Sequence, residues 1–145
     1  MRTRAVLPCV VVVLIAAATP AQDAKKELDK LQGEWTMVSL EQRGKKVPEE
    51  TAKQHKLTIK GDEWTVRAGD GPENKATFKI DPSKDPKTID MTFKVADREI
   101  PSQGIYKLEG DTLTLCRTAG NLERPKEFKT TEKAGILVVW KRAKN

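Results

Sequence analysis

The chain has 145 residues, a formal net charge of +6 and 5% aromatic residues. This length fits a single domain. The basic and acidic residues are interspersed rather than gathered in blocks, so we expect no nucleic-acid partner. One His and two Cys do not supply the ligand clusters of a zinc site, and we expect neither a metal nor a cofactor.

The first 21 residues have the features of a secretory signal peptide. Arg2 and Arg4 precede an apolar run over 5–18 that is too short to span a membrane comfortably. Thr19 and Ala21 are small residues, as the last positions before a signal-peptidase cut require. We predict cleavage near Ala21, a secreted or periplasmic mature domain over 22–145, and membrane involvement only through the cleaved peptide. Cys116 is then the only cysteine, so an internal disulfide is excluded.

The mature chain is predicted to begin with a short helix over 23–31, followed by a strand over 34–43. Trp35 lies at the start of this strand, two residues after Gly33. We expect Trp35 to plug one end of a β-structure and the helix to cover that end as a lid. The strand's apolar alternation is impure, because Met37 and Leu40 fall on opposite faces of a regular strand.

Two tight hairpins are predicted at Gly61-Asp62 and Gly110-Asp111, since glycine at the first of two turn positions suits a type II′ turn. The same device at both places predicts that the two turns lie at one end of the structure. Counting outward from the turns places apolar residues opposite one another. These pairs are Ile59 with Trp64, Leu57 with Val66, Leu108 with Leu113, and Tyr106 with Leu115.

Alternating apolar residues predict further strands over 76–80, 89–95 and 136–141, and a weak strand over 126–131 around Phe128. A partly helical link over 45–56 joins the first two strands. Short strands in hairpin order are typical of an up-and-down antiparallel barrel or a sandwich. A barrel is favoured because closure leaves no exposed edge. We predict an all-β barrel of about eight strands, or nine if the segment around Phe128 is a true strand.

Several motifs resemble a family of small secreted bacterial domains with a lipocalin-like fold, which occur as paralogues in planctomycete-type bacteria. They are Leu31-Gln32-Gly33-Glu34-Trp35-Thr36, Gly44 to Glu50, Lys87-Thr88-Ile89-Asp90, Gly104-Ile105-Tyr106, Gly110-Asp111-Thr112-Leu113 and Arg124-Pro125. The resemblance covers nearly the whole mature chain. The family has no assigned activity, so the resemblance implies a fold and no catalytic residues. It also implies that Trp35 closes the barrel floor beneath a basic side chain, either Arg142 or Lys141, through a cation–π contact.

Candidate ligand-binding residues are those expected on the inner face or rim of the barrel: His55, Trp64, Phe78, Met91, Phe93, Tyr106 and Leu115. Methionine and aromatic side chains suit an apolar ligand, although the same residues would equally form a plain core. No charged residue is expected on this face to orient an anionic head group. The residues expected to have structural roles are Gly33, Trp35, Gly61, Gly110 and Arg142.

The sequence therefore predicts a monomeric binding module that holds a small apolar molecule at the open end of the barrel. The mouth would be built from 45–55, 69–74, 96–101 and 119–125. The alternative is a filled barrel whose loops contact an envelope protein or polysaccharide, with no small ligand. We expect no enzyme, because no serine lies in a nucleophile elbow and the carboxylates of Glu49 and Glu50 fall on a surface helix.

Overall fold

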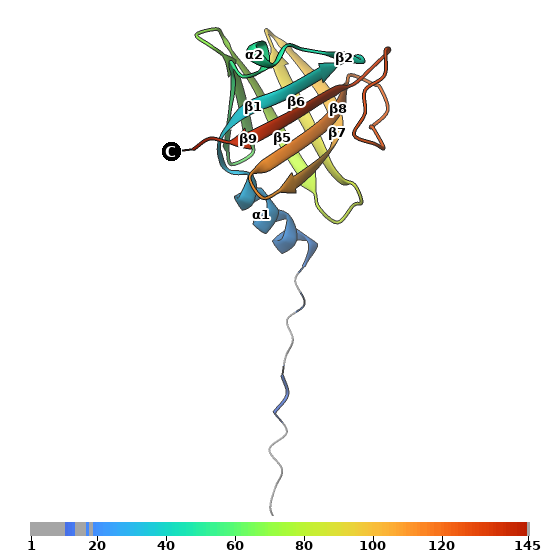
Figure 1. Ribbon diagram of the computed structural model, residues 1–145. Coiled ribbons are helices and arrows are strands. Elements are labelled where there is room, and N and C mark those ends of the chain that lie inside the picture. The colour runs from blue at the N-terminus through green and yellow to red at the C-terminus, as the bar shows by residue number, and fades with distance from the viewer. Residues whose placement is uncertain (1–10, 14–16, 18, 145) are drawn as a thin grey trace, which may run out of the picture.

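The computed structural model describes residues 11–13, 17 and 19–144 (Figure 1). Most of the predicted signal peptide lies outside these residues, and its predicted cleavage site falls in the first turn of helix α1 (Pro20–Leu31). A second, short helix, α2 (Glu49–Ala52), lies between strands. The strands are β1 (Gly33–Gln42), β2 (Lys45–Lys46), β3 (His55–Lys60), β4 (Glu63–Ala68), β5 (Glu73–Asp81), β6 (Lys87–Val95), β7 (Arg98–Glu109), β8 (Thr112–Ala119) and β9 (Ile136–Arg142).

The strands form a closed antiparallel barrel. They are hydrogen-bonded in the order β1-β3-β4-β5-β6-β7-β8-β9, and β9 pairs back onto β1. Of the nine strands only β2 lies outside this ring, as a two-residue extension paired with β1. The predicted all-β, lipocalin-like barrel of eight strands is confirmed. Figure 1 shows α1 at one end of the barrel and α2 at the other.

Both predicted hairpins have the expected register. Ile59 pairs with Trp64 across the first turn, and Tyr106 pairs with Leu115 across the second. Gly61 and Gly110 have positive φ angles of 63° and 58°, as the first position of a type II′ turn requires. Both turns lie at the α1 end, because the Gln32 amide bonds to the backbone of Gly61 and the Arg142 amide N–H donates to the Asp111 carbonyl.

A β-bulge explains the impure alternation of β1. The register of β1 against β9 shifts between Met37 and Ser39. The extra residue restores the inward orientation after the shift, so Trp35, Met37 and Leu40 are 0%, 5% and 8% exposed. Met37 and Leu40, which fall on opposite faces of a regular strand, therefore lie on the same buried face of β1.

Three sequence predictions of element boundaries are wrong. The segment around Phe128 is not a strand but part of a long loop over 120–135, which we call the strap. Phe128 packs outside the barrel, where the Lys107 ammonium lies 5.0 Å from its ring centroid. Strand β7 starts at Arg98, so most of the 96–101 segment that was predicted as a loop of the mouth is strand, and Pro101 is tolerated because β8 pairs with β7 only from Ser102 onward. Helix α1 begins earlier than expected, because the Thr19 hydroxyl caps it and Pro20 occupies its first turn.

Trp35 closes the floor of the barrel beneath α1. Its indole N–H donates to the Leu31 carbonyl at 3.0 Å. Arg142, and not Lys141, covers the ring, with its guanidinium carbon 4.3 Å from the ring. The same guanidinium donates to the carbonyls of Gln32 at 2.9 Å and Lys30 at 2.6 Å, so it also satisfies the end of α1.

A buried carboxylate fastens α1 to the barrel wall, and the sequence pattern did not indicate it. Glu27 is 7% exposed and lies 2.6 Å from the Lys87 ammonium. The Tyr106 hydroxyl donates to the same carboxylate at 3.5 Å. The pKa of Tyr106 is raised above its ordinary value. Burial is the largest cause, and the nearby charge of Glu27 is the next. The floor is thus closed by polar contacts as well as by Trp35.

Candidate functional site: a cavity in the open half of the barrel

The barrel is filled at the α1 end and hollow at the other. Near the floor, the interior is packed by buried side chains that include Phe78, Met91, Tyr106 and Leu113. Above them a cavity of about 420 Å³ opens at the mouth. Its apolar walls include Met37, Leu40, Trp64, Val66, Phe93, Ile100, Leu115, Ile136, Val138 and Trp140. This volume lies within the range typical of small-molecule sites.

The cavity divides the predicted ligand-binding residues into two groups. His55, Trp64, Phe93 and Leu115 line it. Phe78, Met91 and Tyr106 do not, because they belong to the packed layer nearer the floor. Trp64 forms the boundary, with edge-to-face contacts to Phe78 at 5.9 Å and to Trp140 at 6.2 Å between ring centroids.

The mouth is built partly from the predicted loops. His55, Asn74 and Ala119 contribute to it from the expected segments. The 96–101 segment contributes differently, because β6 and β7 extend as a hairpin that turns at Ala96 and Asp97. Val95, at the end of β6, is 52% exposed on the rim.

His55 is oriented by backbone carbonyls rather than by a catalytic partner. Its Nδ1 lies 3.1 Å from the Thr51 carbonyl oxygen and 3.3 Å from that of Ala52. Both partners are carbonyl oxygens, which only accept hydrogen bonds, so Nδ1 must carry a hydrogen. No described carboxylate forms an ion pair with His55, and Cys116 bonds instead to the Lys129 carbonyl of the strap. The described residues contain no group of three His, Cys, Asp or Glu side chains that could hold a metal.

The prediction that no charged residue lies on the inner face is wrong, because Arg117 lines the cavity. Arg117 lies two residues after Leu115 on β8, opposite Gly104 of β7. Its guanidinium carbon is 4.4 Å from the Phe93 ring, and its Nη1 donates to the Ser102 hydroxyl at 3.3 Å. A Cβ at Gly104 would come within 3.0 Å of the Arg117 Cβ and 2.7 Å of the Cys116 carbonyl oxygen, so a glycine is needed here.

The charge of Arg117 is not balanced by a carboxylate. None of the ion pairs among the described residues includes it. Burial lowers its pKa to about 10, so the guanidinium stays protonated at neutral pH. The other cations that line the cavity are Lys75 and Lys94, and none of the described residues that line it is acidic. The cavity is therefore apolar with a positive field.

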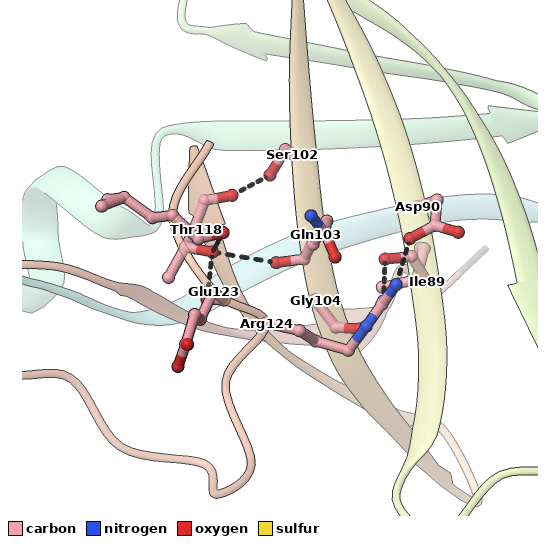
Figure 2. A network of polar contacts seen from close by, with 9 residues as sticks. Ile89, Asp90, Ser102, Gln103, Gly104, Thr118, Glu123 and Arg124 are labelled. Atoms are coloured by element: carbon pink, nitrogen blue, oxygen red, sulfur yellow. Dashed lines mark hydrogen bonds and ion pairs between the residues drawn. The ribbon is translucent and has the colours of Figure 1, made fainter. Parts of the chain in front are cut away.

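Side chains and backbone of the strap bond to β6, β7 and β8, the last of which carries Arg117 (Figure 2). The Arg124 guanidinium donates to the carbonyls of Ile89 at 3.1 Å and Gly104 at 2.8 Å, and it pairs with Asp90 at 2.5 Å. The Thr118 hydroxyl donates to the Glu123 carbonyl at 2.8 Å. The Ser102 hydroxyl in turn donates to the Thr118 carbonyl at 2.6 Å. This bond fixes the hydroxyl hydrogen, so the lone pairs of the Ser102 oxygen are oriented toward Arg117.

A wider groove of about 900 Å³ adjoins the cavity at the mouth, between the β1–β2 turn and the strap. Arg117 lines both spaces. The groove also has Arg43, Lys45, Lys46 and Lys133 on its surface, with Glu132 as its one acidic residue among those described. An anion that approaches the mouth therefore meets a basic surface before it reaches Arg117.

Comparison of the chain with known protein families, curated proteins and solved structures found no match. Within residues 11–13, 17 and 19–144, no helix is both long enough and apolar enough to cross a membrane.

Proposed function

We propose that the protein is a binding module that holds a small apolar molecule in the open half of its barrel. The observation that supports this is the cavity of about 420 Å³, which is continuous with solvent at the mouth and walled mainly by aliphatic and aromatic side chains. A barrel filled along its whole length, the alternative predicted from the sequence, would not have this space.

A neutral fluorescent probe tests the proposal directly. N-phenylnaphthylamine fluoresces more strongly in an apolar site, and we expect saturable binding to the wild-type protein. Val138→Phe places a larger side chain into the cavity from β9 and should weaken probe binding. Val139→Phe is the matched control, because its side chain is on the opposite face of the same strand. Absence of saturable binding, or equal weakening by both substitutions, would contradict the proposal.

A second experiment identifies the natural ligand. Native mass spectrometry of the protein, purified from its own source without detergent, should show an added mass that is lost on denaturation. A bare mass under several growth conditions, together with no probe binding, would favour the interaction module that contacts an envelope protein or polysaccharide.

We also propose that the protein is secreted or periplasmic and works as a monomer without catalysis. The basic residues, apolar run and small residues of 1–21 support secretion. The carbonyl partners of His55 and the separation of Cys116 from the cavity support a role without catalysis. N-terminal sequencing of the exported protein should start near Gln22, and light scattering should give the monomer mass.

A further inference from the structure

Arg117 is an unusual side chain for the wall of an apolar cavity. Its only hydrogen bond to a described residue is to the Ser102 hydroxyl, which leaves most of the five guanidinium N–H donors without a protein acceptor. Among the described side chains, the one fully buried N or O atom without a partner is Nε1 of Trp140. The unpartnered donors of Arg117 are therefore not fully buried, and they face open space. Arg117 lines both the cavity and the basic groove beside it, so these donors are open to an anion that enters through the mouth.

A partly buried cation is stabilised by a compensating anion, and none of the described residues supplies one. The ion pairs of the described residues do not include Arg117, and no carboxylate from this part of the chain lines the cavity. Phe93 accepts only the face of the guanidinium, through a cation–π contact at 4.4 Å. The edge of the guanidinium remains available, and its N–H donors match a carboxylate through two parallel hydrogen bonds.

We propose that the cavity binds an amphiphile with a carboxylate head group, in which the carboxylate pairs with Arg117 and the apolar chain lies against the Trp64 and Leu115 walls. This inference rests on the proposed function and names the ligand class for the same site. Lys75 and Lys94 are exposed, so Arg117 is the one partly buried cation among the described residues of the cavity and balances one negative charge, which favours a carboxylate over a doubly charged phosphate. The basic groove at the mouth provides the approach for such an anion.

Ser102 is a positioning residue in this arrangement. Its hydroxyl hydrogen is committed to the Thr118 carbonyl at 2.6 Å, so its oxygen accepts from Arg117. Thr118 is fixed in turn by the strap through the Glu123 carbonyl (Figure 2). The strap, on the outside of the barrel, therefore supports the orientation of the guanidinium inside it.

The test compares three ligands that share one chain and differ in head group: decanoate, decanol and decyltrimethylammonium. Each is titrated at neutral pH against the wild-type protein loaded with N-phenylnaphthylamine, and displacement of the probe is measured. We expect decanoate to bind about tenfold more tightly than decanol, because its head group forms charge-assisted hydrogen bonds. Decyltrimethylammonium should bind most weakly. Equal binding of all three would overturn this inference and leave the proposed function intact, whereas no displacement by any of them would count against both.

Substitutions locate the head group. Arg117→Met keeps the length of the side chain and should weaken decanoate about 10- to 100-fold, with decanol unchanged or stronger. Lys94→Met is the matched control, since it removes the same charge from the cavity mouth, and we expect less than about a twofold change for decanoate. Ser102→Ala should lower the preference for decanoate over decanol by about threefold, a ratio that a purely structural defect would not alter. Equal effects of Arg117→Met and Lys94→Met would overturn Arg117 as the head-group site.

Discussion

Replacing Arg142 with methionine tests whether the floor of the barrel holds the fold together. The substitution keeps an apolar stem over Trp35 and removes the guanidinium. It deletes hydrogen bonds to the carbonyls of Lys30 and Gln32 and the cation–π contact at 4.3 Å. We assign about 1 kcal/mol to each of these three contacts, because water replaces part of the lost hydrogen bonding. The pair with Asp111 adds little, since that side chain is 76% exposed.

The expected loss is thus about 3 kcal/mol in the free energy of unfolding, or about 10 °C in Tm for a domain of this size. Urea denaturation followed by tryptophan fluorescence and by circular dichroism measures it. Lys141→Met is the control at the neighbouring exposed position, and Arg142→Lys, which keeps the charge without the planar fork, should lose about half as much. A loss below about 1 kcal/mol for Arg142→Met, or one equal to that of Lys141→Met, would refute the assigned role.

Other substitutions test separate parts of the argument. Trp35→Ala should cost about 3–5 kcal/mol in urea denaturation, because the ring is fully buried, and a loss below about 1 kcal/mol would mean that Trp35 does not organise the floor. Gly110→Val should cost about 1–3 kcal/mol through the positive φ alone, since a Cβ there meets nothing within 4 Å, and an unchanged Tm would contradict this. Arg117→Met should stabilise the ligand-free protein by about 1–2 kcal/mol at neutral pH. The reason is that burying the unpaired charge costs more free energy than the hydrogen bond to Ser102 and the contact with Phe93 contribute.

The pH dependence of the Arg117→Met effect has a definite sign. Burial lowers the pKa of Arg117 to about 10 in the folded protein, below its value in the unfolded chain. The folded state therefore disfavours the charged form, and the penalty is fully present below the folded pKa. It declines as the pH rises through about 10, so wild type should approach the variant in stability there. A stability difference that stays constant between neutral pH and about pH 11 would contradict this reasoning.

Most of the barrel was predictable from local patterns. The turn glycines at 61 and 110 set the register of both hairpins, and the register orients every side chain on the paired strands. The β1 bulge was visible only as a fault in alternation, since both Met37 and Leu40 are apolar and the pattern alone does not show where the extra residue lies. The 126–131 part of the strap is predicted as a weak strand because Phe128 is apolar, but the Phe128 ring lies outside the barrel, beneath the Lys107 ammonium.

The candidate site was only partly predictable. Counting outward from the turn pairs Tyr106 with Leu115 and, two residues further along each strand, Gly104 with Arg117. The sequence therefore contained the signal that places an arginine inside. An inward charge contradicts the usual polarity of a barrel, in which charged side chains face the solvent, so the apolar pattern of the inner face gave no reason to place Arg117 there. The depth of the cavity was not predictable, because it depends on how far Phe78, Met91 and Tyr106 fill the interior above Trp35.

The pairing of β1 with β9 has a consequence for how the protein is made. Strand β1 completes its hydrogen bonds only when β9 pairs with it. Trp35, near the start of the barrel, therefore gains its contact with Arg142 only after nearly the whole domain has been made. During synthesis, the edge of β1 that pairs with β9 therefore stays open until the residues of β9 have emerged. Such a chain is slow to reach a compact form. It also means that a truncation before β9 would leave two unpaired edges and a strong tendency to aggregate.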